Sequence, residues 1–271
     1  MLSEINSDII NTIIQGETLE EMKRLADGSV DMILADLPYG TTACKWDTVI
    51  PFEPLWEQYE RVIKPNGAIV LTASQPFTSA LVMSNPGGFK HSWIWHKVSA
   101  GNFMTAKYEP LKTTEDVLVF SKKGKRVNYY PIYTRGHKDR TKDGKDGVVG
   151  KQKSSLYNDI KSGVFRHGNN KPADARYPKH LIEFSNANRN GIVHPTQKPV
   201  ALFEYLIRTY TNEGELVLDN VIGSGTTAVA AINTGRQFIG IEREEEYVNI
   251  ARERVAQAYA ERAKTEVMSN D

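Results

Sequence analysis

Residues 215–233 read ELVLDNVIGSGTTAVAAIN. The apolar start predicts a short buried strand over 215–219, and the Thr- and Ala-rich end predicts a helix from Thr226. Between them, GSGTTA (223–228) matches the pattern G-x-G-x-x-G/A, in which glycines let a ligand approach the backbone. Another strand, 237–241, runs to Glu242, placed where an acid accepts hydrogen bonds from ribose hydroxyls. This arrangement predicts an adenosine-binding site, and the absence of a lysine after Gly225 argues against a phosphate-binding Walker loop.

Strand and helix patterns alternate along most of the chain. The predicted strands are 9–14, 30–35, 68–72, 91–97, 115–121, 215–219 and 237–241, and the predicted helices are 19–26, 52–63, 199–211, 226–233 and 245–264. Such alternation on both sides of an insertion predicts an α/β fold with a doubly wound, mostly parallel sheet.

Composition narrows the class of protein. The 271 residues are 40% apolar and 25% charged, which suits one large domain or a main domain with an insertion. One cysteine excludes a disulfide framework, and no His/Cys/Asp set has metal-ligand spacing, so no metal is expected. No apolar run approaches the length of a membrane span, and the N-terminus lacks a basic signal-peptide region. We therefore expect no membrane contact and a cytoplasmic location.

Positive charge is concentrated in the middle of the chain. Residues 121–180 hold sixteen Lys/Arg against five Asp and no Glu, a net charge of +11, so the rest of the chain carries −10. This block also contains six aromatic residues and many Gly and Asn: the aromatics are Tyr129, Tyr130, Tyr133, Tyr157, Phe165 and Tyr177. A loop-rich basic surface of this kind indicates a polyanionic partner, although a solvated insertion has the same composition.

The second informative stretch is VDMILADLPYG, residues 30–40. Asp36 follows an apolar strand, at the end of a parallel strand that faces the ligand crevice. Pro38 restricts Leu37 to extended geometry, which can hold the Leu37 carbonyl beside the Asp36 carboxylate. Two acceptors and the flat ring of Tyr39 suit a planar base that bears an exocyclic amino group.

Five segments together resemble one family. DLPY resembles the D-P-P-Y motif of amino-directed DNA methyltransferases, and VLDNVIGSGTT resembles their cofactor loop, D-P-F-x-G-S-G-T-T. HPTQKP (194–199), IIQGETLEEM and GIEREEEYVNIARERV are similar to flanking segments of the same family. The motif order resembles the permuted β group. The resemblance implies a circularly permuted, Rossmann-like methyltransferase fold with a catalytic half (1–120), a basic target-recognition insertion (121–193) and a cofactor-binding half (194–271).

The resemblance also assigns residues to roles. The implied catalytic residues are Asp36, Leu37, Pro38 and Tyr39. The implied S-adenosylmethionine-binding residues are Gly16, Glu17, Asp36, Thr196, Gln197, Lys198, Asp219, Asn220, Gly223, Ser224, Gly225, Thr226, Thr227 and Glu242. The chain departs from the family pattern at Leu37, which replaces a proline, at Asn220-Val221, which replace Pro-Phe, and at Glu17, which replaces an aspartate.

The expected reaction is methyl transfer to the N6 amino group of adenine in double-stranded DNA, bound through the insertion 121–193. The alternative is N4-cytosine methylation, whose enzymes commonly carry serine where Asp36 stands. Cytosine C5 methylation is disfavoured because Cys44 follows alanine and not proline. Two alternatives come from other classes: a nicotinamide dehydrogenase, and a non-catalytic DNA-binding module. An RNA substrate, a homodimer and a restriction endonuclease partner remain open, as does the recognition sequence.

Overall fold

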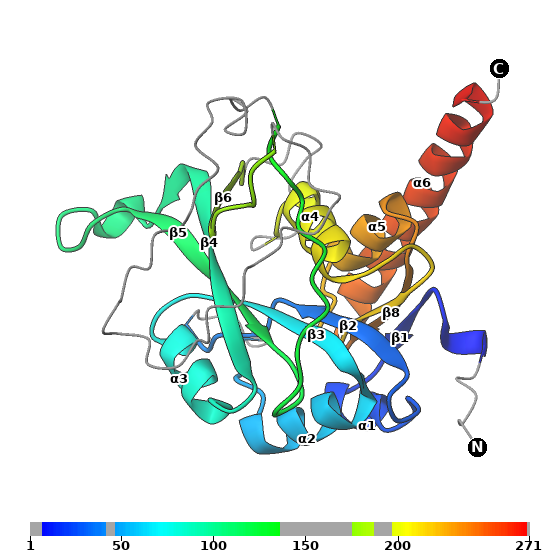
Figure 1. Ribbon diagram of the computed structural model, residues 1–271, viewed down its shortest axis with the longest axis horizontal. Helices are drawn as coiled ribbons and strands as arrows, with labels where there is room; N and C mark the ends of the chain where they lie inside the picture. Colours follow the sequence, from blue (N-terminus) through cyan, green and yellow to red (C-terminus); the bar gives the residue numbers. More distant parts are fainter. Residues whose placement is uncertain (1–6, 42–46, 136–174, 187–196, 270–271) are drawn as a thin grey trace, which may run out of the picture. The chain divides into compact units, whose positions relative to one another are not determined.

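The computed structural model describes residues 7–41, 47–135, 175–186 and 197–269 (Figure 1). The chain divides into two compact units, 1–130 with 180–271, and 131–179. In the described part of the second unit, an antiparallel bridge joins Thr134 to Arg176, and the rings of Tyr133 and Tyr177 lie 5.1 Å apart. No helix in the described residues is long and apolar enough to cross a membrane.

The first unit contains an eight-stranded sheet of order β1-β8-β7-β2-β3-β5-β4-β6. Five neighbouring strands, from β1 to β3, are parallel, whereas β5 pairs antiparallel with both β3 and β4. This confirms the predicted mostly parallel α/β sheet. The strands are β1 Thr12–Gln15, β2 Val30–Ala35, β3 Ile63–Ala73, β4 Phe89–Gly101, β5 Lys112–Phe120, β6 Leu181–Phe184, β7 Leu216–Asp219 and β8 Gln237–Glu242.

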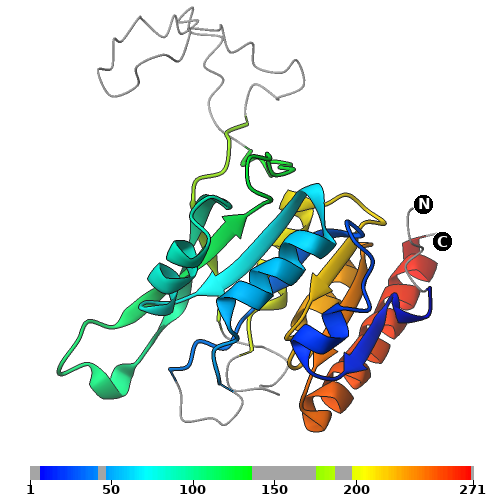
Figure 2. The ribbon, with the colours of Figure 1, turned by 90° about the horizontal axis from the view of Figure 1, so that it is seen from below.

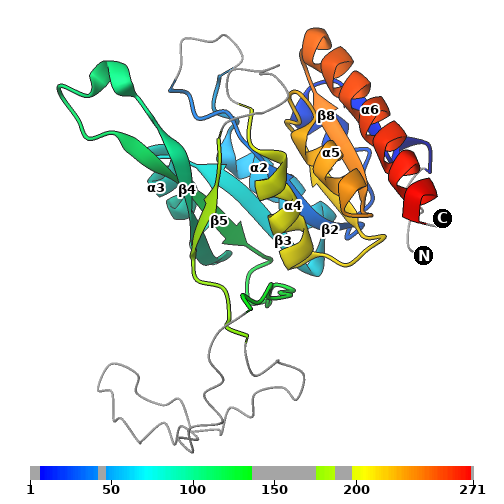
Figure 3. The same ribbon diagram turned by 90° about the horizontal axis from the view of Figure 1, so that it is seen from above.

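Helices cover both faces of the sheet, which separates two apolar cores (Figures 2 and 3). One core packs α4, α5 and α6 against the sheet, and the other packs α1, α2 and α3. The helices are α1 Thr18–Met22, α2 Phe52–Val62, α3 Phe77–Ser84, α4 Val200–Tyr210, α5 Thr226–Asn233 and α6 Glu245–Ser269, with short 3-10 turns η1 Ser7–Ile9 and η2 Phe103–Thr105.

Strand β2 lies between both cores, which explains the apolar sequence of its residues 32–35. Its one acid, Asp31, binds Lys64 Nζ at 2.7 Å and accepts the backbone N–H of Leu216 at 3.0 Å. Burying a carboxylate is costly unless it is paired, and here both oxygens have a donor. The acid therefore ties β2 to its two neighbours.

The strand order reverses direction between β7 and β2. From β2 the chain passes through α2 to β3 on one side, and from β7 it passes through α5 to β8 on the other. In open α/β sheets a crevice forms outside the carboxyl ends of the strands at such a reversal. Asp36 follows β2 and Asp219 ends β7, so both acids lie at this crevice.

Among the described residues, one α-helix and one strand were not predicted from the sequence patterns. Helix α3 was missed because its sequence, FTSALVMS, is apolar on most sides. Strand β6 was missed because it is four residues long and pairs only with the distant β4, in parallel.

Candidate active site

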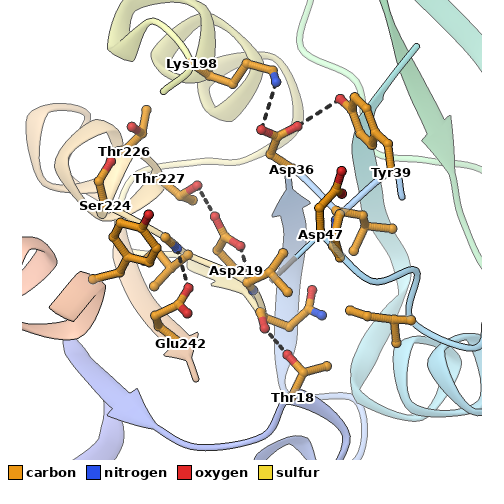
Figure 4. A pocket seen from close by; sticks show the side chains of 18 of the residues that line it. Thr18, Asp36, Tyr39, Asp47, Lys198, Asp219, Ser224, Thr226, Thr227 and Glu242 are labelled. Carbon is orange, nitrogen blue, oxygen red and sulfur yellow. Dashed lines mark hydrogen bonds and ion pairs between the residues drawn. The ribbon is translucent and has the colours of Figure 1, made fainter. Parts of the chain in front are cut away.

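A pocket of about 530 Å³ opens at the carboxyl ends of the parallel strands (Figure 4). Most of the predicted site residues line it. They are Glu17, Asp36, Leu37, Pro38, Tyr39, Gln197, Lys198, Asp219, Asn220, Gly223, Ser224, Thr226, Thr227 and Glu242. Gly16 and Gly225 do not line the pocket, and Thr196 lies outside the described residues, as do Cys44 and His194.

The glycine loop presents open backbone to this pocket. Gly223 has a φ of +50°, and a side chain added there would meet no atom closer than 4.0 Å, so a ligand has room to approach. Gly225 serves packing instead. Its φ is +86°, and an added Cβ would lie 3.0 Å from the Cβ of Ala251 in α6. Gly223 therefore leaves room for a ligand on the pocket side of the loop, and Gly225 lets the loop pack closely against α6.

Glu242 fixes the loop from the end of β8. Its Oε2 accepts the N–H of Gly223 at 2.9 Å, and its Oε1 accepts the N–H of Glu244 at 2.9 Å. The backbone N–H of Gly16 donates to the Glu242 carbonyl at 3.0 Å, so Gly16 holds the backbone of Glu242 without lining the pocket. Each carboxylate oxygen accepts about two hydrogen bonds, which leaves Glu242 capacity for ligand hydroxyls.

Asp219 lies at the bottom of the pocket and is 3% exposed. Its carboxylate accepts a hydrogen bond from the Thr227 hydroxyl and another from the Val221 N–H at 3.1 Å. Burial raises the pKa of Asp219 to about 7, against the lowering effect of these two hydrogen bonds. The pocket therefore holds a carboxyl group that changes charge near neutral pH, where a cationic ligand favours its ionised form.

Two buried polar atoms in the pocket have neither a hydrogen-bond nor an ion-pair partner among the described residues. They are Nδ2 of Asn220 and Oε1 of Gln197. The Asn220 side chain is oriented by Tyr59, whose hydroxyl donates to Oδ1 at 2.6 Å and so leaves Nδ2 as the donor. Buried polar groups without partners are rare in folded proteins, and a bound polar ligand is one way to satisfy them.

Asp36 is held by three side chains. The Tyr39 hydroxyl donates to Oδ1 at 2.9 Å, the Thr72 hydroxyl donates to the same oxygen, and Lys198 Nζ binds Oδ2 at 2.8 Å. Burial, followed by the charge of Asp36, raises the pKa of Tyr39 well above its usual value, so its hydroxyl remains a donor. Oδ1 is thereby filled, whereas Oδ2 keeps one acceptor position.

Lys198 connects Asp36 to a second ion pair. Its Nζ lies 3.4 Å from Oε2 of Glu115, and the other oxygen of Glu115 binds Lys97. Burial alone would lower the pKa of Lys198, but the charges of Asp36 and Glu115 raise it above the usual value. The cluster of Lys97, Glu115, Lys198 and Asp36 thus alternates positive and negative charge along the pocket wall.

The loop that follows Asp36 is fixed by a residue that the sequence did not single out. Asp47 accepts the N–H of Gly40 at 2.8 Å and that of Thr41 at 2.9 Å. The ring of Tyr39 stacks on Phe77 with centroids 5.0 Å apart and an angle of 25°, and Lys198 Nζ lies 5.6 Å from the ring centroid. These contacts give Tyr39 a defined orientation beside Asp36.

Three contributors to the site were missed by sequence reasoning: Thr72, Glu115 and Asp47. Thr72 and Glu115 lie on β3 and β5, whose antiparallel pairing brings them to the pocket from distant positions. A polar residue inside an apolar strand, as in AIVLT for Thr72, is the only local signal. Among the described residues, no group of three His, Cys, Asp or Glu side chains has a geometry suited to a metal.

Comparison with known proteins identifies the class. Residues 30–253 match the sequence model of the N6/N4 methyltransferases, described as DNA methylase. The chain belongs to this family of amino-directed DNA methyltransferases. The family membership rules out the nicotinamide dehydrogenase considered above. The match covers the DLPY segment, the glycine loop and Glu242 in one domain.

Individual relatives agree with this assignment. The type II methyltransferase M.HpaI of Haemophilus parainfluenzae is 29% identical over 90% of this chain and 73% of its own. M2.DpnII of Streptococcus pneumoniae, another type II methyltransferase, is also 29% identical, over 90% of this chain and 88% of its own.

Solved structures share the fold. The structure of the M1.HpyAVI–SAM complex is 26% identical, with a TM-score of 0.60 over 90% of this chain and 98% of that one. The cytosine-N4-specific PvuII DNA methyltransferase, at 18% identity, has a TM-score of 0.63 over 89% of this chain and 85% of that one. At 18% identity the second likeness shows a common fold only.

Proposed function

We propose that this protein transfers a methyl group from S-adenosylmethionine to the N6 amino group of adenine in double-stranded DNA. The observation that carries the proposal is the position of Asp36, an acid and not a serine, in the same pocket as the glycine loop and Glu242. The DNA methylase family supplies the class of reaction, and the choice of adenine is our inference from Asp36.

The pocket has the groups that S-adenosylmethionine needs. Glu242 has acceptor capacity for the ribose hydroxyls, the open side of Gly223 leaves room for the ligand, and Asp219 offers a negative charge to a cation. The unpartnered Nδ2 of Asn220 and Oε1 of Gln197 match a ligand with both donors and acceptors. When bound, the cofactor supplies a methyl group activated by a sulfonium.

The residues around Asp36 suit an amino group that approaches that methyl. The remaining acceptor position of Asp36 Oδ2 and the carbonyl of Leu37 would bind the two amino hydrogens and favour a pyramidal nitrogen as it attacks. Tyr39 would stack on the base, which must be rotated out of the duplex to reach this pocket. Lys198 and Thr72 hold the Asp36 carboxylate in place.

The basic block of residues 121–180 is the proposed DNA contact, because its charge of +11 suits a phosphate backbone. Basic side chains there would neutralise phosphates and so place the target strand, and base contacts within 121–193 would set the recognition sequence. Since both relatives described above carry the name type II methyltransferase, we further propose that the protein acts in a restriction–modification pair.

Mass spectrometry of nucleosides tests the choice of base. Purified protein is incubated with unmethylated DNA and S-adenosylmethionine, and the DNA is digested to nucleosides. We expect N6-methyladenine as the product, absent when the cofactor is omitted. N4-methylcytosine as the sole product would assign the reaction to the alternative, and no methylated nucleoside of either kind would favour a non-catalytic DNA-binding module.

The titration of Asp219 should make the affinity for S-adenosylmethionine depend on pH. With a pKa of about 7, this carboxyl is largely protonated below pH 7 in the free protein, and a bound cation must displace that proton. Affinity for S-adenosylmethionine should therefore rise with pH through 7, by about tenfold between pH 6 and pH 8. Calorimetry over this range measures it. The Asp219→Asn variant should bind with an affinity that varies less than about threefold.

The raised pKa of Asp219 also makes the free energy of unfolding depend on pH. Because the pKa of Asp219 is raised above the ordinary 3.8, its contribution to stability is present below pH 3.8 and is lost as pH rises toward 7. The free Asp219→Asn variant should thus have a higher Tm than the wild type at pH 8 and a smaller difference at pH 5. An equal Tm difference at both pH values would show that Asp219 does not titrate as described.

A further inference from the structure

The connection between β4 and β5, residues 102–111, exposes large apolar side chains. Phe103 is 77% exposed, Met104 84% and Tyr108 90%. Isolated exposed apolar residues are ordinary on protein surfaces, but three in six residues of one loop form a group. The group belongs to the first compact unit and is not part of the pocket lining.

Polar side chains of the same loop form hydrogen bonds with one another and with its backbone. Asn102, in the left-handed region at φ +51°, accepts the N–H of Lys112 at 2.7 Å and donates to Oε1 of Glu109 at 3.0 Å. The Thr105 hydroxyl donates to the same Glu109 oxygen at 2.6 Å. Hydrogen bonds from Thr105 and Asn102 lower the pKa of Glu109. These hydrogen bonds hold the loop in a defined conformation, while Phe103, Met104 and Tyr108 remain exposed on it.

The loop is a direct extension of the pocket wall. Trp95 and Lys97 on β4 and Glu115 on β5 line the pocket, and both strands continue past it to the loop (Figure 3). At about 3.3 Å per residue, Gly101 lies roughly 13 Å beyond Lys97 along the strand. The tip of the hairpin therefore lies roughly 13 Å or more beyond the pocket wall, a distance comparable to the roughly 12 Å width of the major groove of DNA.

We propose that the loop 102–111 enters the DNA duplex beside the target base, with Phe103, Met104 and Tyr108 as an apolar wedge that occupies the space of the extruded base. This inference rests on the proposed function. Proteins that unstack duplex DNA use side chains of this kind between base steps, and aromatic rings stack on any base.

Charge and size favour DNA over a second copy of the chain. Glu109 accepts hydrogen bonds from Asn102 and Thr105, whereas Lys107 is exposed on the loop, and Lys112 at its end lies 3.8 Å from Glu109. The outward charge is positive, as a contact to phosphates requires. A stable dimer needs about 800 Å² and 20–30 residues from each partner, more than three side chains at a hairpin tip provide.

The test compares two DNA substrates that share the methylated sequence, which is first identified by single-molecule sequencing of DNA from cells that express the protein. In one duplex the target adenine is paired, and in the other it faces an abasic site, so that extrusion is already easier. The triple variant Phe103→Ala/Met104→Ala/Tyr108→Ala should lose about tenfold or more in kcat/KM on the paired duplex. On the duplex with the abasic site it should stay within about threefold of the wild type.

Met83→Ala is the matched control, because Met83 is 72% exposed on α3 and outside the pocket. It should match the wild type on both substrates. A second readout is the fluorescence of 2-aminopurine at the target position, which rises when the base leaves the stack. We expect this rise with the wild type and Met83→Ala, and a much smaller rise with the triple variant at saturating protein.

The outcomes separate the two proposals. If the wild type methylates neither duplex, the proposed function fails. If the wild type is active and the triple variant equals it on the paired duplex, the wedge is overturned and the proposed function stands. Equal losses on both duplexes, together with a change from dimer to monomer in sedimentation, would show that the loop joins copies of the chain and would also overturn the wedge.

Discussion

Replacement of Asp36 by alanine should lower kcat for methyl transfer by about a hundred- to a thousandfold. The variant removes the acceptor that is preset beside the Leu37 carbonyl, and no other carboxylate takes its place, since Glu115 is engaged by Lys97 and Lys198. Single-turnover methylation with labelled S-adenosylmethionine measures the loss. Calorimetry on the same variant should show a much smaller loss of cofactor affinity than of kcat, because Glu242, Gly223 and Asp219 are untouched.

Asp31→Asn is the matched control for this experiment. Asp31 is another acid of the same strand segment, but it lies at the opposite end of β2, where it binds Lys64 and the Leu216 N–H. Its variant should lose stability and keep kcat within about threefold. If Asp36→Ala also keeps its kcat, Asp36 is not part of the reaction, and the proposed mechanism is wrong.

The second large effect is expected at Glu242. Glu242→Ala should weaken S-adenosylmethionine binding by about ten- to a hundredfold, the usual contribution of hydrogen bonds to a charged group. Part of the loss comes from ribose contacts, and part from the Gly223 N–H, which would no longer be held at 2.9 Å. Calorimetric titration of the purified variant gives the dissociation constant, and kcat at saturating cofactor should fall much less.

Glu244→Gln controls for the loss of a nearby acid. Glu244 is two residues further along, is paired with Arg243 at the surface, and does not line the pocket. Its cofactor affinity should equal that of the wild type. Unchanged affinity in Glu242→Ala would contradict the placement of the adenosine beside β8.

The parallel part of the sheet was predicted from local sequence because each of its buried strands is a short apolar segment that can be recognised without its partners. The segment 30–35 was predicted with the observed bounds, since a strand buried on both faces is mostly apolar, and five of its six residues are. The loop 223–228 was predicted because only glycine suits its positive φ at Gly223 and Gly225. Such features are dictated by neighbours in the sequence.

The antiparallel edge of the sheet carried weaker signals. Strands β4 and β5 were predicted seven residues long each, whereas they span Phe89–Gly101 and Lys112–Phe120 as one long hairpin. Their extended ends are exposed and therefore lack an alternating pattern. The contribution of Glu115 to the site depends on the pairing of these strands, which brings it within 3.4 Å of Lys198 across 83 positions of sequence.

Lys198 illustrates the limit of motif-based reasoning. The resemblance put it among the cofactor-binding residues, and it does line the pocket. Its ammonium group, however, lies 2.8 Å from Asp36 Oδ2 and 5.6 Å from the Tyr39 ring. We therefore propose that Lys198 acts on the catalytic segment, where it holds the acceptor carboxylate in place.

The most direct test of the central claim is a crystal structure of the protein with a non-reactive cofactor analogue and a duplex that contains the target site. The distances to measure join the exocyclic nitrogen of the extruded adenine to Asp36 Oδ2 and to the Leu37 carbonyl oxygen. We predict that the amino nitrogen lies about 2.7–3.2 Å from each of these two oxygens, within hydrogen-bond distance. An extruded base whose amino group lies beyond reach of both oxygens, with Asp36 bound only to Lys198, Tyr39 and Thr72, would contradict it.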